Sequence, residues 1–553
     1  MKKAWKPKFE AAAADVPLVA RLLAARGITG EEDAARFFEP QYEHAHDPLL
    51  LADMPKAVER IQDAIAQGEQ ITVYADYDAD AITAAAVLLR YFQQVNYKNV
   101  DYYIPDRFAE GYGINPEAIR VLIARGTKLI ITVDCGINAS EAVDLANSLG
   151  TEVIITDHHQ LTDGIPRAAA VVNPRRPDDK YPFKDLTGVG VAFKLVQGLG
   201  AGGWAKWLLD LVAIGTVADC QSLLGENRIF VKWGMLVLKK TRWIGLQTLL
   251  EGVGLGGQEL DTYKIGFLIA PRLNAAGRIA HGNIALELLL TDDGDRARTL
   301  ADKLEELNRH RQELTEQILS EAREQLALAK DKKVLLAQGE NWPRGIVGLV
   351  AGKLTDEFYR PVLVLSRSES EAVGSARSVF GFNIVEAIGQ SREILLRYGG
   401  HAQAAGFTLT TEHIEVFHRN LLSYADAALP EELLSPVLYY DAEIELSEVS
   451  EELLNNLQKF EPHGVGNPRP KFRINNLQAR NVKKIGNSEK HLRMYVSDES
   501  ENQRIGCIGF NLGFWAEKLQ EGAVIDMICE PQFNEWNGER NIQLKIVDLC
   551  QRN

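Results

Sequence analysis

The sequence predicts an α/β protein with a parallel-sheet domain, a long connecting helix, a smaller α/β domain and a C-terminal β-barrel. Three observations predict this architecture. Between residues 70 and 172, short continuous apolar runs alternate with helical patterns, which is typical of a parallel sheet covered on both faces. Residues 295–330 contain neither Gly nor Pro, and their leucines recur at helical spacing. Near the C-terminus, short alternating runs indicate the strands of a small barrel.

The individual elements follow from these patterns in chain order. In the first domain each apolar run predicts a buried strand, and Asn115-Pro116 has the cap and first-turn residues of a helix. The expected strands of this domain are residues 71–74, 100–104, 129–133, 153–156 and 169–172, and its helices include 82–92 and 139–149. The second domain is expected to have strands at 334–337, 362–366 and 372–375 and a helix at 346–358.

Five parts are expected along the chain. Residues 1–60 form a helical lead-in, residues 61–294 the parallel-sheet domain with a helical extension, and residues 295–330 the connecting helix. Residues 331–430 form the second α/β domain, and residues 431–553 an acidic linker followed by the barrel.

Length and composition restrict the class of protein. The 553 residues carry a net charge of −15, and 46% of them are hydrophobic, so the chain should form three or four ordinary globular domains. No apolar run approaches the roughly 18 residues of a membrane helix, and the N-terminus lacks the apolar region of a secretory signal. The five dispersed cysteines form no C-x-x-C pair. We therefore expect a cytoplasmic protein without a membrane segment.

A group of carboxylates follows the first predicted strand. Asp76, Asp78 and Asp80 lie at alternate positions in a turn, and repulsion between unit charges about 4 Å apart costs about 1 to 4 kcal/mol. A divalent cation removes this cost, because hard cations prefer oxygen ligands. The alternative is a solvated acidic turn that binds nothing.

Further acidic and imidazole side chains follow neighbouring strands. Asp134 ends the third strand, and Asp157-His158-His159 ends the fourth. The carboxyl ends of parallel strands meet at one edge of a sheet, where ligands bind. Mixed imidazole and carboxylate donors suit Mn²⁺, and also Mg²⁺ or Zn²⁺, and Asp219 is a further candidate ligand. So many shared carboxylates predict two metal ions and a phosphoester hydrolase.

Together with other motifs, these residues resemble the RecJ-type single-strand-specific DNA exonucleases of the DHH phosphoesterase superfamily. The resemblance implies a DHH domain, a DHH-associated domain and a C-terminal OB-fold. It also implies a 5′→3′ exonuclease that degrades single-stranded DNA to 5′-mononucleotides in repair and recombination, with Mn²⁺ preferred and Mg²⁺ possible. The matching segments are AHDPLLLADMPKAVERI, PDRFAEGYGI, TVDCGI, DHH, TGVGVAFKL, GTVADC, APRLNAAGR, GENWPRGIVGLVAGKL, SARS, GGHAQAAG and EPHGVGNPRPKF.

The family pattern also implies roles for the candidate residues. One metal ion would be held by Asp78 and Asp134, and the other by Asp80, Asp134, His158 and Asp219, with Asp76 ligating or orienting from beside them. Asp157 and His159 would position the ligating imidazole and the phosphate. In the GGHAQAAG loop, His401 would contact the scissile phosphate, and Gly399 and Gly400 would let the backbone approach closely.

A site for the terminal 5′-phosphate is implied as well, formed by Arg107, Arg278, Ser375 and Arg377. Arginine suits this role because its rigid fork donates two parallel hydrogen bonds to phosphate oxygens. The alternative for each arginine is a structural ion pair.

Ala81 departs from the family pattern, which has glycine at this position. If the glycine serves a turn with positive φ, Ala81 strains the loop that carries Asp78 and Asp80. If it only starts the following helix, alanine favours that helix. We favour the second alternative, because residues 82–92 have a good helical pattern.

The start of the predicted barrel is strongly basic. Between Lys459 and Arg493 there are nine basic and two acidic residues, a net charge of +7 within a chain that is acidic as a whole. OB-folds combine such a basic groove with aromatic stacking platforms. We expect the DNA grip to include Arg469, Lys471, Arg473, Lys483 and Lys484. The aromatic candidates for stacking are Phe472, Tyr495, Phe510, Phe514, Trp515 and Trp536.

Two other functions compete with the exonuclease. A phosphoesterase acting on short oligonucleotides or small nucleotides is disfavoured by the barrel and by the chain length. A non-catalytic scaffold is disfavoured because all the expected metal ligands are present. We expect a monomer that acts on single-stranded DNA, and the resemblance implies a single-strand-binding protein and a helicase as partners.

Overall fold

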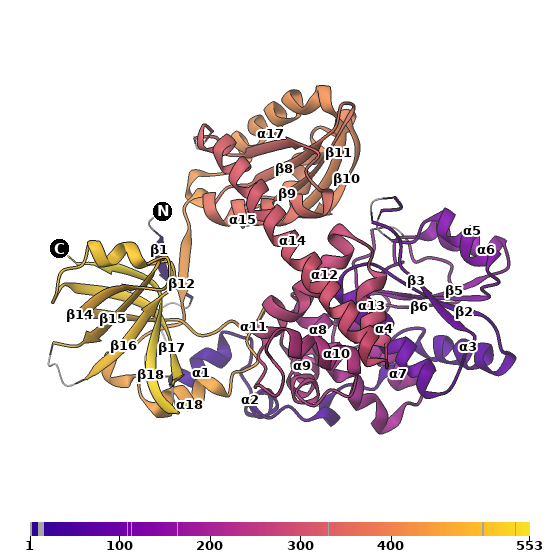
Figure 1. Cartoon of the computed structure of the whole chain (residues 1–553), viewed down its shortest axis with the longest axis horizontal. Helices are drawn as coiled ribbons and strands as arrows, with labels where there is room; N and C mark the ends of the chain where they lie inside the picture. Colours follow the sequence, from indigo (N-terminus) through magenta and orange to yellow (C-terminus); the bar gives the residue numbers. More distant parts are fainter. Residues whose placement is uncertain are drawn as a thin grey trace. The chain divides into compact units, whose positions relative to one another are not determined.

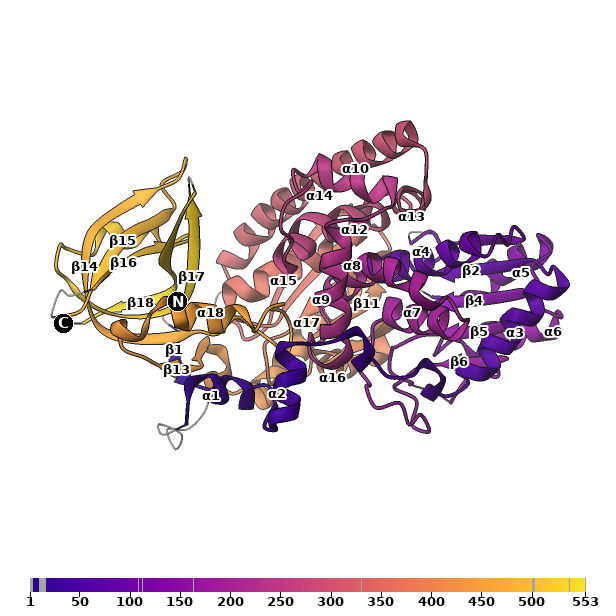
Figure 2. The ribbon, with the colours of Figure 1, turned by 90° about the horizontal axis from the view of Figure 1, so that it is seen from below.

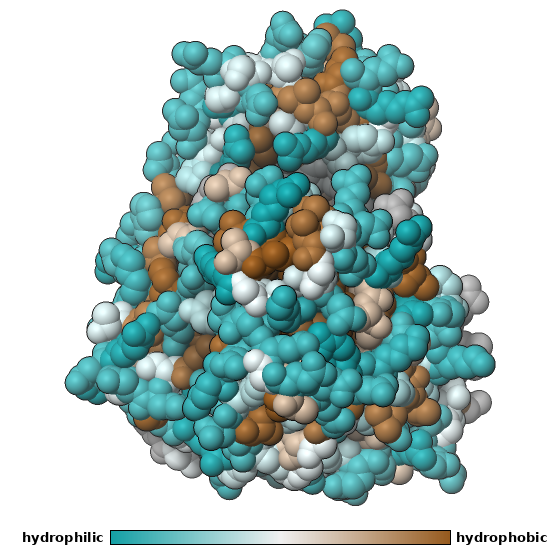
Figure 3. All heavy atoms as spheres, turned by 90° about the vertical axis from the view of Figure 1, so that its right-hand side faces the viewer, coloured by the Kyte–Doolittle hydropathy of each residue, from teal (hydrophilic) through white to brown (hydrophobic). Residues whose placement is uncertain are grey.

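The computed structural model describes residues 3–8, 16–107, 109–111, 113–162, 164–329, 331–499, 503–536 and 538–552. The chain divides into two compact units. One comprises Ala45–Gln221 and Gly225–Pro436, and the other comprises Met1–His44, Ser222–Leu224 and Val437–Asn553. In the described part of the chain, every helix is too short or too polar to cross a membrane. The face seen in Figure 3 is mainly hydrophilic, with hydrophobic residues in small groups.

A five-stranded parallel sheet organises the first domain, with strand order β3-β2-β4-β5-β6. The predicted sheet is confirmed, because the apolar runs form its five strands, of which β3 is half-buried and the other four are almost fully buried. Helices α5 and α6 cover one face, and α3, α4 and α7 cover the other (Figure 1). The strands are Ile71–Ala75, Val100–Tyr103, Leu129–Val133, Glu152–Thr156 and Ala170–Val172, numbered β2 to β6. The helices are α3 Met54–Gln67, α4 Ala79–Gln94, α5 Pro116–Ala124, α6 Ser140–Ser148 and α7 Gly188–Gly198.

Strand register aligns the carboxyl ends of four strands. Ala75 pairs with Val133, Val133 with Thr156 and Thr156 with Val172. The residues that follow these positions are therefore neighbours at one edge of the sheet. They are Asp76, Asp134, Asp157 and Asn173.

A helical extension follows the sheet and ends in the long helix α14, Gly294–Ala327. Helix α14 packs on α10, α12 and α13 of this extension, and also on α15 (Arg344–Phe358) and β7 (Leu335–Glu340) of the second α/β domain. The expected connecting helix is thus confirmed as one uninterrupted element (Figures 1 and 2). The extension contains α8 Leu209–Ala218, α9 Gly225–Leu238, α10 Ile244–Gly252, α12 Ala270–Ile279 and α13 Asn283–Leu290.

The second α/β domain has a five-stranded mixed sheet of order β10-β11-β9-β8-β7. The GGHAQAAG segment, expected as a loop, forms the end of β10, a tight turn and the start of β11. Glycine and alanine have low strand propensity, so nothing in the local pattern indicates this hairpin. The strands are β7 Leu335–Glu340, β8 Val362–Arg367, β9 Glu371–Arg377, β10 Leu395–His401 and β11 Ala404–Thr410. The helices are α15 Arg344–Phe358, α16 Ile384–Gly389 and α17 Ile414–Ala428.

The C-terminal strands form a closed five-stranded barrel, as predicted. Its strand order is β14-β15-β16-β18-β17, and β14 closes the barrel by pairing with β17. Leu492, Met494 and Val496 alternate into the barrel core, which is the alternation that identified the strand in the sequence. The strands are β14 Phe472–Ile485, β15 His491–Ser497, β16 Arg504–Gly509, β17 Val524–Trp536 and β18 Glu539–Gln551.

The N-terminal residues belong to the same unit as the barrel. Strand β1 (Ala4–Pro7) pairs with β12 (Val437–Tyr440), and α1 (Leu18–Ala24) and α2 (Glu31–Phe38) contribute to the barrel core. The residues expected as one lead-in, 1–60, therefore divide between the two units. The expected acidic linker forms strand β12, the short strand β13 (Ala442–Glu443) beside β14, and helix α18 (Glu451–Gln458). Amphipathic patterns show that a helix covers a core, but not which core it covers.

Candidate active site

The acidic turn after β2 holds its carboxylates in different ways. Asp78 is the N-cap of α4, and its Oδ1 accepts the Ala81 N–H at 3.0 Å. Asp80 is buried in the first turn of α4, where its carboxylate accepts the N–H groups of Gly188 and Val189 at 2.7 and 2.9 Å. The turn is therefore fixed against the beginning of α7.

Ala81 lies in the first turn of α4 and is fully buried. Its N–H group donates to Asp78, and Ala79 N–H donates to Asn274 Oδ1 at 2.9 Å. The backbone is helical here, so the residue that departs from the family pattern favours the helix and does not strain the turn.

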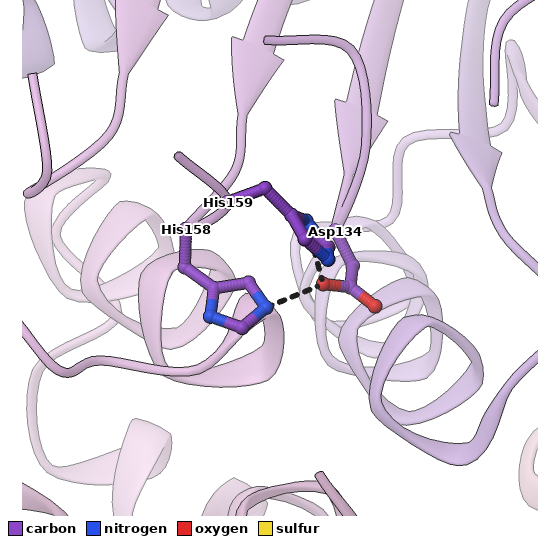
Figure 4. Close-up of side chains that lie close together, drawn as sticks. All are labelled: Asp134, His158 and His159. Atoms are coloured by element: carbon purple, nitrogen blue, oxygen red, sulfur yellow. Dashed lines mark ion pairs between the residues drawn. The ribbon is translucent and has the colours of Figure 1, made fainter. Parts of the chain in front are cut away.

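Asp134 and His158 form the centre of the site. His158 Nε2 lies 3.0 Å from Asp134 Oδ1, 3.8 Å from Asp219 Oδ2 and 3.9 Å from Asp80 Oδ2. Figure 4 shows the neighbouring His158 and His159 rings, both joined by dashed lines to the same oxygen of the Asp134 carboxylate. Two groups in the described part of the chain could hold a metal ion, Asp134–His158–His159 and Asp80–His158–Asp219. The fold thus brings together four segments that are far apart in the sequence.

Asp157 holds the segment that carries His158 and His159 in place. Its carboxylate accepts the N–H groups of Ile137, His158 and His159 at 2.9, 2.7 and 3.0 Å, and Oδ1 lies 2.8 Å from His159 Nδ1. Burial opposes ionisation of Asp157, but the hydrogen bonds from His159 prevail and lower its pKa. Burial likewise opposes the charge on His159, yet Asp157 raises the pKa of His159 to about 9. His159 is therefore protonated at neutral pH in the metal-free protein.

The remaining carboxylates carry an electrostatic cost. Burial, and then repulsion from neighbouring carboxylates, raises the pKa of Asp76, Asp80 and Asp134 well above the usual value. The same causes raise the pKa of Asp219 to about 6. Burial, and then the charge on His159, lowers the pKa of His158 to about 3. In the metal-free protein these shifts favour protonated carboxyl groups and a neutral imidazole, and a bound cation would favour the ionised carboxylates.

Several oxygen and nitrogen atoms of these side chains have no hydrogen-bond partner. Buried polar atoms are normally hydrogen-bonded, so a cluster of buried polar atoms without partners indicates that the site binds a ligand. The unpaired atoms are Asp76 Oδ1, Asp134 Oδ1, His158 Nε2 and Asp219 Oδ2. A set of three carboxylate oxygens and one imidazole nitrogen fits a divalent cation such as Mn²⁺ or Mg²⁺.

Two glycines that sequence reasoning missed make room for the carboxylates. A Cβ at Gly188 would lie 2.5 Å from the side chain of Asp134, and a Cβ at Gly215 would lie 2.8 Å from Asp80 Oδ1. Both glycines stand in segments that carry the family resemblance, TGVGVAFKL and GTVADC. Their position in those segments was the available signal.

An arginine cluster lies where the two α/β domains meet. Arg278, in the last turn of α12, donates to the Gly345 carbonyl at 3.3 Å, and Arg377 donates to Ser375 Oγ at 3.0 Å. Arg107 lies over the Tyr77 ring at 4.8 Å. Burial, together with the charges of Arg107, Arg311 and Arg377, lowers the pKa of Arg278 to about 10. The arginines predicted from the sequence are therefore electrostatic neighbours, and Arg311 is an addition from the structure.

His401 lies on the face of the second sheet that also carries Arg377. Ala404 pairs with both His401 and Arg377, so the three residues form one row, and the outer two are about 10 Å apart. His401 is exposed. Within the described residues, no hydrogen bond or ion pair joins it to the Asp–His cluster. Gly400 has φ 143°, and a Cβ there would meet the Ala404 backbone, so the hairpin itself requires this glycine. At Gly399 a Cβ would meet open space.

Several basic residues expected to grip DNA are engaged within the barrel unit. Arg473 lies 3.1 Å from Glu443 and 3.6 Å from Asp526, so the structural ion pair is its observed role. Lys484 pairs with Glu517 at 2.5 Å. The Lys471 backbone donates to Asp441, and Arg469 lies 3.8 Å from Glu461, whereas Lys483 is exposed. The net charge of +7, counted over residues 459–493, leaves out acidic residues elsewhere in the unit that pair with these basic residues. They are Asp441, Glu443, Glu517 and Asp526.

The outer surface of β14, β15 and β16 combines basic residues with an aromatic ring. Arg480, Tyr495 and Gly506 lie in one row across β14, β15 and β16, and Lys483, Arg493 and Ile508 lie in another. Arg504 lies 4.5 Å over the Tyr495 ring. Phe472 is buried in the core, Phe510 and Phe514 are exposed, and Trp515 packs against the core. The Trp536 side chain lies outside the described residues.

Profiles of three known domain families match this sequence. The DHH family, N-terminal domain, matches residues 70–216, the DHHA1 domain matches residues 331–426, and the RecJ OB domain matches residues 440–548. These segments correspond to the parallel sheet with α7 and α8, to the second α/β domain, and to the barrel with the strands before it.

Curated relatives and solved structures match over almost the whole chain. The single-stranded-DNA-specific exonuclease RecJ of Bacillus subtilis is 40% identical over 537 residues, 97% of this chain and 68% of the relative. Its namesake from Escherichia coli is 33% identical over 96% of each chain. The crystal structure of RecJ from Thermus thermophilus in complex with Mn²⁺ has a TM-score of 0.83 and 29% identity, covering 100% of this chain and 80% of that one. The corresponding Mg²⁺ complex has a TM-score of 0.76.

Proposed function

The chain belongs to the RecJ family, and from this premise we propose that it is a metal-dependent exonuclease that degrades single-stranded DNA from the 5′ end. The products are 5′-mononucleotides. One observation carries the proposal. Unpaired, buried carboxylate and imidazole donors lie together at the carboxyl edge of the parallel sheet, near an arginine cluster suited to phosphate.

In this proposal the Asp–His cluster holds two divalent cations, with Mn²⁺ preferred and Mg²⁺ possible. Asp78 and Asp134 hold one, and Asp80, Asp134, His158 and Asp219 hold the other, with Asp76 beside them. When bound, such ions supply a hydroxide nucleophile and stabilise the leaving oxygen of a phosphodiester. Asp157 keeps the two histidines in place through its three backbone hydrogen bonds.

Phosphate recognition falls to cationic residues around the cluster. Protonated His159 attracts the scissile phosphate, which His401 contacts from the second α/β domain. Arg107, Arg278, Ser375 and Arg377 hold the terminal 5′-phosphate. In this proposal the 5′-phosphate site lies beside the cleavage site. Each cleavage therefore removes one nucleotide from the 5′ end, and degradation proceeds 5′→3′.

The barrel contributes a local DNA grip in the same proposal. Exposed Lys483 fits the expected grip, and Arg493, Arg504 and Tyr495 extend it along the outer face of β15 and β16. In OB-folds this face binds single strands. We further propose that the protein acts as a cytoplasmic monomer in repair and recombination, together with a single-strand-binding protein and a helicase. These last points rest on the family resemblance.

The proposal is tested by a time course on a long, 5′-phosphorylated single strand with Mn²⁺ or with chelator. Stepwise release of 5′-mononucleotides, abolished by chelator, is the expected result. Asp134→Ala should abolish cleavage and leave DNA binding largely intact. Cleavage restricted to dinucleotides or short oligomers would replace this function by that of a small-nucleotide phosphoesterase. Metal-independent binding without hydrolysis would indicate a scaffold.

A further inference from the structure

Arg175 lies at the carboxyl edge of the parallel sheet, in the loop that follows β6. Asn173 anchors the start of this loop. It is fully buried, donates to the His159 carbonyl at 2.9 Å and accepts the Arg175 N–H at 2.8 Å. Because His159 follows β5, these two hydrogen bonds fix the backbone of Arg175 beside the Asp–His cluster.

The next residue, Arg176, has the structural role in this loop. It is buried, and its Nη1 donates to Asp53 Oδ2 and to the Val171 carbonyl, both at 2.6 Å. Arg175 instead lies 3.3 Å from Asp185, whose side chain is 51% exposed. Exposed ion pairs of this kind contribute little to stability. The fold of the loop therefore depends on Arg176, and Arg175 can be changed without unfolding it.

The Arg175 guanidinium joins two further segments of the site. Its Nε donates to the Lys184 carbonyl at 3.3 Å, and its Nη2 lies 3.3 Å from both Asp185 Oδ1 and Gln221 Oε1. The first two of these residues come just before α7, whose first N–H groups bind Asp80. Gln221 comes just after the end of α8. One side chain therefore connects the loop after β6 with the ends of two helices that form the site.

Gln221 extends this contact to Asp219. Because Gln221 Oε1 accepts from Arg175, its NH₂ group is free to donate to the carboxylate. Burial and then Asp78 raise the pKa of Asp219 to about 6, and a hydrogen bond from Gln221 and the charge of Arg175 oppose this rise. Between the two residues, Cys220 has φ 57°, a left-handed conformation that is uncommon for cysteine. Such strain persists where function requires it, and Asp219 Oδ2 remains unpaired for a ligand.

We propose that Arg175 is a positioning residue for the metal site, and that through Gln221 it holds Asp219 in the orientation that binds a divalent cation. Asp219 belongs to only one of the two proposed ions, the one it shares with Asp80 and His158, so Arg175 acts selectively on that ion. Residues that orient metal ligands in this way contribute about 10- to 100-fold to metal affinity. The inference rests on the proposed function and deepens it by assigning control of one ion to a residue that binds no metal itself.

Isothermal titration calorimetry of the full chain with Mn²⁺, without DNA, tests the inference. The wild type should show two binding events. Arg175→Gln should raise the Kd of one event about ten- to hundred-fold and leave the other unchanged. Arg175→Lys should have a smaller effect, since the charge remains but the planar fork is lost. Arg167→Gln, which changes an exposed arginine before β6, is the matched control and should bind Mn²⁺ as the wild type does.

A double-mutant cycle shows whether Arg175 acts through Gln221. Gln221→Ala alone should weaken the same binding event, and adding Arg175→Gln should weaken it little further, because both changes break one chain of contacts. Additive losses would show that Arg175 acts on the site independently and would overturn the inference. An unchanged Kd in Arg175→Gln, or equal losses at both ions, would overturn it as well.

Cleavage assays on the same proteins separate this inference from the proposed function. An unchanged Mn²⁺ affinity in an Arg175→Gln protein that cleaves single strands would refute the role of Arg175 alone. A selective loss of Mn²⁺ affinity, with a wild type that does not cleave single strands, would support the positioning role and refute the exonuclease. A wild type that binds no Mn²⁺ would refute both.

Discussion

Asp134 combines an unusual backbone conformation with a central position in the site. Its φ of 59° places it in the left-handed region, which Asp and Asn adopt more readily than most residues. Its carboxylate is buried, unpaired at Oδ1 and 3.0 Å from His158. Backbone strain and a buried charge at one position are both unfavourable, and such residues persist where function requires them. The free energy of unfolding of the metal-free protein should therefore depend on the charge state of this cluster.

We predict that metal binding stabilises the protein more at high pH. The pKa of Asp219 is raised from 3.8 to about 6, first by burial and then by Asp78. Its contribution to stability is fully present below pH of about 4 and is lost as the pH rises through about 6. Asp80 and Asp134 shift in the same direction. The Tm gain on adding Mn²⁺, measured by thermal unfolding, should be larger at pH 7.5 than at pH 5.5.

Asp134→Asn keeps the left-handed backbone and removes a buried ionisable group that neighbouring carboxylates oppose. It should raise the metal-free Tm at pH 7.5 by about 2–4 °C and abolish most of the gain from Mn²⁺. Asp144→Asn, at an exposed position of α6, should change neither quantity. A Mn²⁺ gain that is equal at both pH values would contradict the assignment of the cluster as the metal site.

At the scale of elements, the site depends on how closely helix α7 approaches the sheet. Its first two N–H groups bind Asp80, and its first residue, Gly188, leaves room for Asp134. Gly188→Ala would displace the central carboxylate, and a misplacement of about 1 Å costs about 100-fold in rate. We predict a loss of exonuclease activity of that size with little change in circular dichroism. Gly203→Ala, where a Cβ meets open space, should retain activity, and equal losses in both variants would refute this account.

The barrel strands lead to a separate prediction about DNA affinity. Tyr495→Ala should weaken binding of single-stranded DNA about five- to hundred-fold, the range for one stacked base. Arg493→Gln should reduce the slope of log K against log salt by about one. Tyr439→Ala, which removes an exposed ring on β12, is the control in the same unit. Fluorescence anisotropy measures both effects, and an unchanged affinity in Tyr495→Ala would exclude this face as the grip.

At the scale of the whole molecule, the two ends of the chain fold together. Leu22, Leu23 and Phe37 are buried in the barrel core, and Phe37 packs on Phe460 with ring centroids 5.5 Å apart. Each buried apolar side chain of this kind contributes about 1.5–3 kcal/mol. Deletion of residues 1–44 should therefore lower the barrel's unfolding temperature by about 10 °C or more.

Calorimetry with and without Mn²⁺ distinguishes the two units in this truncated protein. The transition that Mn²⁺ shifts belongs to the unit with the parallel sheet and should remain near its position in the full chain. An unchanged barrel transition would show that the N-terminal residues do not support the barrel core.

The sequence alone determined the fold class, the order of the domains and the residue types of the site. Apolar runs, helical spacing and acidic turns are local patterns that can be recognised in the sequence. The apolar patterns are recognisable because burying one face of a helix or strand requires the same spacing of apolar residues in every α/β protein. The positions of Asp134, Asp157 and Asp219 at strand and helix ends were visible for this reason. The motifs also predicted the arginines at 278 and 377 as a set.

Tertiary structure decided what depends on contacts between distant segments. It paired Arg473 with Glu443 and Asp526, made the GGHAQAAG segment a hairpin, and assigned the N-terminal helices to the barrel core. The sequence shows which side chains can carry a charge. Whether that charge is neutralised depends on neighbouring residues that only the folded chain brings within a few ångströms.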